Sequence, residues 1–317
     1  MKKEVVVLNC GSSSVKFAII DANTGEAGLS GLAESLGNAD ASITYKLNGD
    51  KTSFSLSANA GHTEALNAIS TIIEDTGVKP VAVGHRVVHG GEKFKQAALV
   101  NDEVLAAVKD YASMAPLHNL ANAKGVVTAQ KAYPHLPHVC VFDTSFFQTM
   151  PQKAFIYALP MNLYRDHGIR RYGFHGTSHK FILDSTASLL NKPVEETSVI
   201  SAHLGNGCSV AAIEKGQAVD TSMGFIPLEG LVMGTRCGDL DPSLPATLQK
   251  KLGKSADEIS DLLNKQSGLL GISELSNDCR TLEEEAEKGH EGAKLAIEIF
   301  CYRLAKYIAS YLIAVPS

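Results

Sequence analysis

The segment from Asn9 to Lys16 (Asn-Cys-Gly-Ser-Ser-Ser-Val-Lys) combines residue types that suit phosphate binding. Gly11 lets the backbone approach an anion closely, while the three serines and the consecutive amide groups offer hydrogen-bond donors. Lys16 adds a positive charge, and the amide oxygen of Asn9 could ligate Mg²⁺ directly or through water. A polar hairpin turn with Lys16 in solvent accounts for the same residues equally well, so this segment alone leaves both interpretations open.

Two familiar nucleotide-binding motifs are incomplete in this sequence. Residues 253–255 (Gly-Lys-Ser) end like a P-loop, but Leu248 stands where that motif requires its first glycine. Residues 205–207 (Gly-Asn-Gly) begin like a dinucleotide fingerprint, but Val210 replaces the third glycine and the segment leads into a predicted strand. Neither motif, in its familiar form, would hold a nucleotide here.

Arg86 stands inside a predicted strand, residues 81–88, that is otherwise largely apolar. An arginine in such a strand is costly unless it meets an anion, so Arg86 could clamp a carboxylate or a phosphoryl group. A buried Arg–Asp pair is the structural alternative, and the residues alone slightly favour it. His85 and His89 lie four positions apart, but on a strand this spacing only places them on one face, and a zinc site is not indicated.

Asp143 and Arg236 are further candidates at predicted loops. Asp143 directly follows the apolar run 138–142, and the C-terminal end of a strand is a common active-site position in α/β proteins. An aspartate that caps a helix or closes a turn is the alternative. Arg236 lies in a loop between glycines, where surface salt bridging is the alternative to a role in binding.

His175 lies between Phe174 and Gly176, a setting that can aim an imidazole ring into a cleft. The alternative is a structural histidine bonded to the backbone, and for His179 we favour that alternative. Taken together, the candidates supply what phosphoryl transfer requires. These requirements are a phosphate turn, cationic groups for the equatorial oxygens, and amide or acidic ligands for Mg²⁺.

Apolar runs and helical periodicity predict the elements that must position these residues. Strands are expected at residues 5–8, 15–20, 81–88 and 138–142, and helices at 65–75, 101–112, with Asn101 as N-cap, and 120–132. Strands that alternate with helices indicate an α/β fold. The pattern restarts after residue 151, with strands at 198–203 and 208–213 around a glycine turn and a mostly helical segment at 283–312.

The two strand–turn–strand segments share one layout, which suggests two related domains at residues 1–150 and 151–317. A length of 317 residues also favours two domains of about 150 residues. The predicted helix 293–314 would normally feed another strand in an α/β unit, so a truncated chain is expected.

Composition removes several classes of protein. The net charge is −5 and the basic residues form no long run, which argues against a nucleic-acid partner. No apolar run approaches the roughly 18–20 residues that span a bilayer, so no membrane association is expected. The apolar residues 5–8 are too few for a signal peptide, so we expect a cytoplasmic protein. The six cysteines are scattered and are interpreted as reduced core residues.

The sequence closely resembles the acetate kinase family over essentially the whole chain, and the matching segments follow one another in the family's order. The resemblance is carried by residues 9–16, 84–92, 116–119, 142–144, 170–179, 203–207 and 234–242. It implies two ribonuclease-H-like domains with mixed sheets flanked by helices, an active site in the cleft between them, ATP/ADP and Mg²⁺ as cofactors, and a homodimer. The family belongs to the superfamily of sugar kinases, actin and heat-shock chaperone ATPases.

The resemblance also implies roles by position. Asn9 corresponds to the Mg²⁺-associated residue, Arg86 and Arg236 to the pair that clamps carboxylate and phosphoryl group, His175 to the donor that stabilises the transition state, and Asp143 to an essential aspartate. The implied pocket for the acetate methyl is formed by Val88, Leu117, Phe174 and Pro227. The implied nucleotide contacts are Ser12, Ser14, Lys16, His203, Leu204, Gly205, Asn206, Gly207, Asp278, Cys279 and Arg280.

The sequence departs from the family in two respects. Phe147 stands where many members have a histidine, and no role is assigned to that position. The family also continues beyond this end with a Gly-rich adenosine loop and a glutamate that helps hold Mg²⁺, which is why we expect the second domain to be incomplete.

The reaction implied is ATP plus acetate giving acetyl phosphate plus ADP, reversibly and by direct in-line transfer. A carboxylate of pKa about 4 is already ionised at neutral pH and needs no general base, so Asp143 is expected to position Mg²⁺ or its waters. A kinase for propionate or butyrate is the near alternative, because one methylene changes discrimination by only ~1–3 kcal/mol. A non-catalytic ATP-binding module of the actin type is the alternative from another class, and the two arginines and His175 argue against it.

Overall fold

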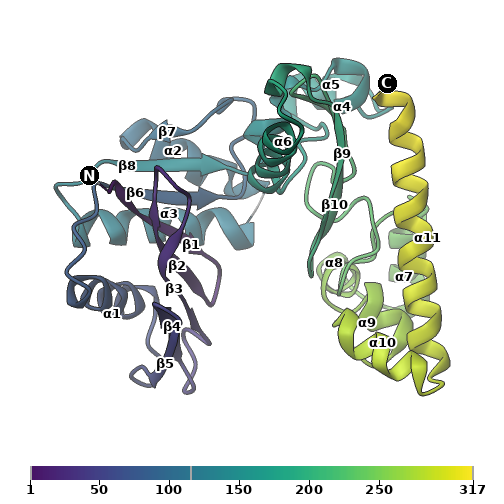
Figure 1. The fold of residues 1–317 in the computed structure, drawn as a ribbon. Coiled ribbons are helices and arrows are strands. Elements are labelled where there is room, and N and C mark those ends of the chain that lie inside the picture. The colour runs from purple at the N-terminus through teal and green to yellow at the C-terminus, as the bar shows by residue number, and fades with distance from the viewer. Residues whose placement is uncertain (1, 115, 316–317) are drawn as a thin grey trace. The chain divides into compact units, whose positions relative to one another are not determined.

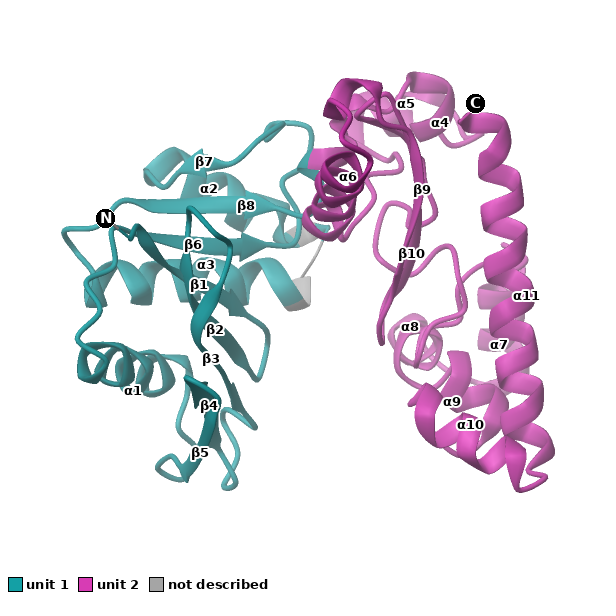
Figure 2. Cartoon of the chain, viewed as in Figure 1, with its two compact units in different colours: residues 1–145 teal, residues 146–317 magenta. Residues whose placement is uncertain are grey.

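The computed structural model describes residues 2–114 and 116–315, apart from the side chains at positions 113, 116 and 117. It divides into two compact units, Met1–Ser145 and Phe146–Ser317, each with its own internal packing (Figure 2). The division falls a few residues before the boundary expected near residue 150. Each unit is described by itself below.

Unit 1 is built on an eight-stranded mixed sheet in the order β5-β4-β3-β2-β1-β6-β8-β7 (Figure 1). Strands β1 to β5 form an antiparallel meander, whereas β1, β6 and β8 run parallel to one another. The strands are β1 (Glu4–Cys10), β2 (Val15–Asp21), β3 (Ala27–Glu34), β4 (Ser42–Leu47), β5 (Asp50–Ser55), β6 (Ala82–Val87), β7 (Ala98–Leu99) and β8 (His138–Phe142).

Parallel strands need crossover connections, and the helices of unit 1 supply them. These are α1 (His62–Asp75), between β5 and β6, and α2 (Asp102–Asp110) with α3 (Pro116–Ala132), between β7 and β8. As predicted, Asn101 caps α2, because its side chain accepts a hydrogen bond from the backbone N–H of Val104 at 2.8 Å. The short 3₁₀ turns are η1 (Tyr111–Ser113) in unit 1, η2 (Ser145–Thr149) at the division between the units, and η3 (Val194–Glu196) in unit 2.

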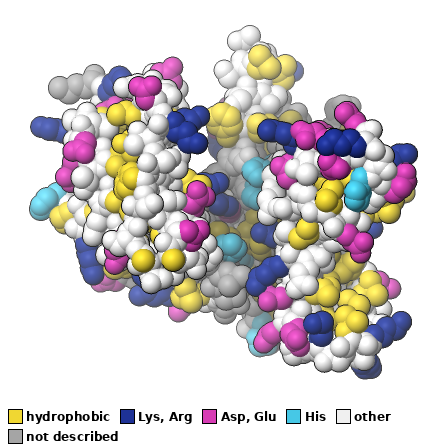
Figure 3. Space-filling view, turned by 90° about the horizontal axis from the view of Figure 1, so that it is seen from below, with side chains coloured by type: hydrophobic (Ala, Val, Ile, Leu, Met, Phe, Trp, Pro, Cys, Tyr) yellow, Lys and Arg dark blue, Asp and Glu magenta, His cyan; other side chains and the backbone are white. Residues whose placement is uncertain are grey.

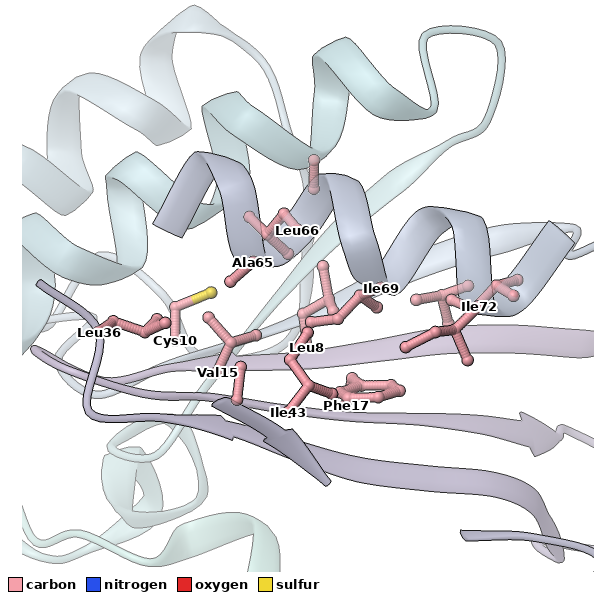
Figure 4. Close-up of a cluster of buried hydrophobic side chains, with 14 of the residues drawn as sticks. Leu8, Cys10, Val15, Phe17, Leu36, Ile43, Ala65, Leu66, Ile69 and Ile72 are labelled. Atoms are coloured by element: carbon pink, nitrogen blue, oxygen red, sulfur yellow. The ribbon is translucent and has the colours of Figure 1, made fainter. Parts of the chain in front are cut away.

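The three helices of unit 1 pack on one face of the sheet. Side chains alternate along β1, so Leu8 and Cys10 point into the core while Asn9 points to the other face. Figure 4 shows α1 lying over these strands, with Ala65 and Ile69 directed toward the sheet. Asn9 is therefore displayed on the face that the helices leave uncovered.

Gly125 of α3 lies close against β1. A Cβ atom at this position would lie 2.4 Å from the sulfur of Cys10, closer than real contacts allow. The absence of a side chain at Gly125 thus lets α3 lie directly against the end of β1, next to the predicted phosphate turn.

Unit 2 contains a smaller sheet than unit 1. The family resemblance implied a mixed sheet, but the described residues of this unit form three antiparallel strands in the order β11-β10-β9, because those after β11 form loops and helices. The strands are β9 (Val199–Leu204), β10 (Cys208–Glu214) and β11 (Gln217–Thr221). The helices are α4 (Gln152–Phe155), α5 (Met161–His167), α6 (Gly176–Leu190), α7 (Leu244–Leu252), α8 (Ala256–Lys265), α9 (Gly268–Ser273), α10 (Cys279–Glu287) and α11 (Glu291–Ala314).

Strand β10 is the centre of unit 2 and is buried along nearly its whole length. Helix α6 packs against β9, and the long helix α11 packs against β10, on either side of the sheet (Figure 1). A strand covered on both faces reads as a continuous apolar run rather than an alternating one, which is how residues 208–213 read in the sequence.

The surface agrees with the composition. On the face of the described residues seen in Figure 3, lysine and arginine side chains are interspersed with aspartate and glutamate rather than gathered in a basic band. Within the described part of the chain, no helix combines the length and apolar character needed to cross a membrane.

Candidate active site

In unit 1, three candidate residues meet at the ends of neighbouring parallel strands. Asn9 lies near the end of β1, Arg86 near the end of β6, and Asp143 directly after β8. The carboxyl ends of parallel strands meet at one edge of the sheet, which is the usual position for binding residues in such folds. Alternation along each strand places all three side chains on the face away from the helices.

Asp143 holds Arg86 in a bidentate ion pair. The Nε and Nη2 atoms of Arg86 donate to the two carboxylate oxygens of Asp143 at 3.0 and 2.6 Å, and Nη1 donates to Oδ1 of Asn9 at 3.4 Å. The Asp143 side chain is 1% exposed, whereas that of Arg86 remains 37% exposed. Burial opposes the charge of the guanidinium, but Asp143 outweighs it and raises the pKa of Arg86.

The Arg–Asp pair that the sequence left open as an alternative is therefore present. The ion pair still leaves part of the Arg86 guanidinium accessible to solvent beside Asn9. Both carboxylate oxygens of Asp143 accept hydrogen bonds from Arg86, and the side chain is almost completely buried.

The predicted phosphate turn is short and well anchored. Asn9 and Cys10 belong to β1, and the turn proper is closed by a hydrogen bond of 2.8 Å from the backbone N–H of Gly11 to the carbonyl of Ser14. The Nε2 atom of His62 lies 2.7 Å from the carbonyl oxygen of Gly11. Lys16 is exposed on β2 directly opposite Asn9, and Ser12 is exposed at the turn.

Asn122 of α3 connects this turn to the end of β6. Its side-chain amide donates to the carbonyl of Cys10 at 2.7 Å, and its side-chain oxygen accepts from the N–H of Val88 at 3.0 Å. Asn122 is buried, as is Val88, one of the residues implied in the methyl pocket. Leu117, implied in the same pocket, falls at the start of α3, and its side chain lies outside the described residues.

In unit 2, His175 stands at the N-terminus of α6 in a left-handed backbone conformation with φ of 60°. Such a conformation is uncommon for a residue other than glycine and is frequent at functional sites. The Nδ1 atom of His175 lies 2.9 Å from the hydroxyl of Ser209, and its ring stacks on that of His203 with centroids 4.0 Å apart. The orientation of the ring is thus fixed from two sides.

Arg236 and His175 converge on Gly207. A Cβ atom on Gly207 would lie 3.3 Å from Nη1 of Arg236 and 3.4 Å from Nε2 of His175, so glycine keeps the space before both groups open. The Nη1 atom of Arg236 also donates to the carbonyl of Pro227 at 2.8 Å. Burial lowers the pKa of Arg236, against an opposing effect of Cys208, and arginine remains charged at neutral pH.

The two predicted nucleotide segments lie next to each other. Asn277 donates from its side chain to Oδ1 of Asn206 at 2.8 Å, and the N–H of Gly234 donates to the carbonyl of Asn206 at 3.0 Å. Asp278 then caps α10 by accepting from the N–H of Arg280 at 2.8 Å. The remaining predicted nucleotide contacts in unit 2, Leu204, Gly205 and Cys279, are all exposed.

The four residues implied in the methyl pocket divide between the units. Phe174 and Pro227 belong to unit 2, where Phe174 is buried and Pro227 is partly exposed, while Val88 and Leu117 belong to unit 1.

Several residues that matter to this arrangement were not singled out from the sequence. They are His62 and Asn122 in unit 1, and Ser201 and Ser209 in unit 2. The signal for the serines was available, because hydroxyls within the buried strands 198–203 and 208–213 must find partners. His179 was expected to bond the backbone. Instead its ring nitrogens lie 3.0 Å from the hydroxyl of Ser201 and 2.8 Å from that of Ser209.

Comparison with known proteins gives consistent matches over the whole chain. The acetokinase family model matches residues 4–316. An acetate kinase from Shewanella baltica is 58% identical over 313 residues, which cover 98% of this chain and 78% of that protein. Among solved structures, a propionate kinase from Francisella tularensis subsp. tularensis SCHU S4 is 45% identical with a TM-score of 0.96, covering 99% of this chain and 81% of that one. An acetate kinase from Porphyromonas gingivalis is 43% identical with a TM-score of 0.92, covering 99% and 80%.

Proposed function

The chain belongs to the acetokinase family, and from this premise we propose that it transfers the γ-phosphoryl group of ATP to acetate, reversibly, giving acetyl phosphate and ADP. The observation that carries the proposal is the convergence of Arg236 and His175 on Gly207, where a cation and an imidazole share a space kept free of side chains. Such a pair suits the negative charge that spreads over a phosphoryl group in transfer.

The mechanism we propose is direct in-line attack by the carboxylate. Acetate is ionised at neutral pH, so its oxygen attacks the γ-phosphorus without a general base. Arg86, oriented by Asp143, binds the acetate carboxylate, while Arg236 and His175 stabilise the equatorial oxygens of the phosphoryl group.

Transfer from ATP of this kind employs Mg²⁺, which neutralises charge on the phosphates. Mg²⁺ takes oxygen ligands, keeps several waters and is held largely by substrate phosphates, so a single protein amide oxygen fits its requirements. Asn9 supplies such an oxygen beside the phosphate turn, where it accepts one long hydrogen bond of 3.4 Å from Arg86 and keeps a lone pair for a metal or its water. Asp143 fits less well as a direct ligand, because both its oxygens bond Arg86 and its side chain is 1% exposed.

The test is an assay of ADP formation with acetate present and with acetate omitted, combined with trapping of acetyl phosphate by hydroxylamine. We expect ADP and the hydroxamate to appear together and only with acetate. ADP release that is independent of any carboxylate would contradict the proposal.

A preference for propionate is the second candidate, favoured by the similarity to the Francisella propionate kinase. One extra methylene is worth only ~1–3 kcal/mol in an apolar pocket. Ratios of kcat/KM for acetate, propionate and butyrate decide between the two, and we expect acetate to be highest.

We further propose a homodimer in the cytoplasm, where ATP is supplied. The exposed apolar side chains of Leu159 and Leu240 in unit 2 line a cavity of about 540 Å³ and offer an apolar contact surface for a second copy. Light scattering after size exclusion should then give twice the mass of the chain, and a monomer mass would exclude the dimer.

A further inference from the structure

A continuous chain of hydroxyl and imidazole groups runs through the interior of unit 2 and ends at His175. The Ser201 hydroxyl lies 3.0 Å from Nδ1 of His179, the Ser209 hydroxyl lies 2.8 Å from Nε2 of His179, and Ser209 lies 2.9 Å from Nδ1 of His175. Ser201 is 4% exposed, and His179 and Ser209 are fully buried.

The secondary structure explains why these groups meet. Ser201 and His203 are two positions apart on β9 and share one face of the sheet, and Ser209 of β10 stands directly opposite His203. Helix α6 packs against β9 and carries His179 one turn after His175, on the same side of the helix.

His179 must be neutral in this setting. Its complete burial, together with the neighbouring His203, lowers its pKa to about 3. A neutral imidazole carries a proton on one ring nitrogen and a lone pair on the other. The direction of every hydrogen bond in the chain therefore follows once the role of one member is known.

Ser201 determines that direction. Among the described residues, its hydroxyl has one hydrogen-bond partner, Nδ1 of His179. A buried O–H without an acceptor costs about 1–3 kcal/mol, so this hydroxyl is the donor and Nδ1 of His179 is the acceptor. The His179 proton is then on Nε2 and is donated to Ser209, whose own hydroxyl can only donate to Nδ1 of His175.

These hydrogen-bond directions determine which ring nitrogen of His175 carries the proton. Because Nδ1 accepts from Ser209, the proton of the neutral ring is on Nε2, the atom that faces Gly207 beside Arg236. Further titratable groups near the ring include His203, which stacks on it, and His179, which lies behind Ser209. We propose that Ser201, His179 and Ser209 are positioning residues that hold His175 as a neutral donor, with its Nε2–H directed at the phosphoryl group in transfer.

This inference rests on the proposed function for its catalytic consequence, but the position of the proton can be measured without activity. In protein labelled with ¹⁵N-histidine, the His175 signal is identified by its loss in His175→Gln. We expect a protonated, pyrrole-like Nε2 and a pyridine-like Nδ1 at pH 7.5. A proton on Nδ1 with a bare Nε2 would overturn the proposal, whether or not the protein transfers phosphate.

Ser209→Ala tests the link itself. Removing the hydroxyl should mix the two His175 tautomers and lower kcat about 10- to 100-fold, while the KM values for ATP and carboxylate stay within about twofold. Thr221→Val is the matched control. It removes another fully buried hydroxyl, which bonds the carbonyl of Val210 at 3.0 Å, and should leave kcat and the His175 spectrum unchanged.

His179→Gln and His179→Leu separate positioning from packing. Glutamine can accept from Ser201 through its oxygen and donate to Ser209 through its nitrogen, so it should retain the His175 tautomer and most of kcat. Leucine fills the space but should behave like Ser209→Ala. Equal kcat and equal His175 spectra in wild type, Ser209→Ala and His179→Leu would overturn the proposal. Wild-type protein that does not phosphorylate a carboxylate would instead overturn the proposed function.

Discussion

At the scale of single residues, the two arginines are held in different ways. Arg86 is bound by a buried carboxylate and is oriented before any ligand arrives, whereas Arg236 bonds only the backbone carbonyl of Pro227 among the contacts described. Pre-orientation reduces the entropy lost on binding, so Arg86 suits a stable substrate. Arg236, next to His175, suits a group that changes charge during the reaction.

Arg236→Ala should lower kcat by about two orders of magnitude or more, because it removes a cation from the phosphoryl group in transfer. The fold should persist, since few contacts are lost. Turnover and circular dichroism check the two expectations, and Arg165→Ala, an exposed arginine of α5, is the control. Near-normal turnover in Arg236→Ala would sink its assigned role.

Asp143→Asn should raise the KM for the carboxylate and lower kcat, because a neutral amide cannot hold Arg86 in the same bidentate pair. Since the carboxylate acts on Arg86, excess Mg²⁺ should not restore the rate. Titration of Mg²⁺ in the variant is the measurement, with Asp184→Asn in an exposed ion pair as control. Recovery of the rate at high Mg²⁺ would show instead that Asp143 serves the metal.

At the scale of elements, strands that coincide with apolar runs in the sequence were predicted more accurately than the segments around them. The strands at 138–142 and 208–213 agree with β8 and β10 within a residue, because both segments are short, mostly apolar runs of residues that favour strands. Strand β3 was missed, since its Gly- and Ser-rich sequence carries little strand preference and pairing with β2 and β4 decides its conformation.

Gly125→Ala tests the contact between α3 and β1. In most helices this change stabilises by up to about 1 kcal/mol, but here the new Cβ would collide with Cys10, so we expect a net loss of about 1–3 kcal/mol. Thermal unfolding should show a lower Tm, while Gly28→Ala, with open space around it, serves as control. A variant as stable as the parent would mean that α3 can shift without cost.

At the scale of the whole molecule, the sequence located the candidate residues but not the contacts that orient them. Asp143 and Arg86 are 57 positions apart, and the ion pair depends on the parallel pairing of β6 with β8. The chain of hydroxyl and imidazole groups that ends at His175 likewise depends on the packing of β9, β10 and α6 together. Short motifs report which residue types are present, whereas such long-range pairings follow only from the complete topology.

The free energy of unfolding should fall as the pH is lowered. Burial lowers the pKa of His85 to about 3, with a further effect of His138, and it lowers the pKa of His138 and His179 as well. Unfolded histidine titrates near 6.5, so below that pH the unfolded chain binds more protons than the folded one. The free energy of unfolding should be constant above pH ~7 and should decline below pH ~6.5 by up to about 1.4 kcal/mol per pH unit for each histidine.

Urea unfolding between pH 8 and 5 measures this decline. His179→Gln should flatten it, and His135→Gln, at an exposed position, should not. A free energy of unfolding that does not change over this range would contradict the neutral, buried state of these histidines.

The bridge made by Asn122 has a consequence for hydrogen exchange. The N–H of Val88 lies just beyond β6 and would exchange quickly with deuterium in an ordinary loop, but its partner is a buried side chain of α3. Exchange at Val88 then requires α3 to move away from the sheet. The deuterium uptake of this single amide would therefore report how often the strand ends that carry Asn9 and Arg86 separate from the helix beneath them.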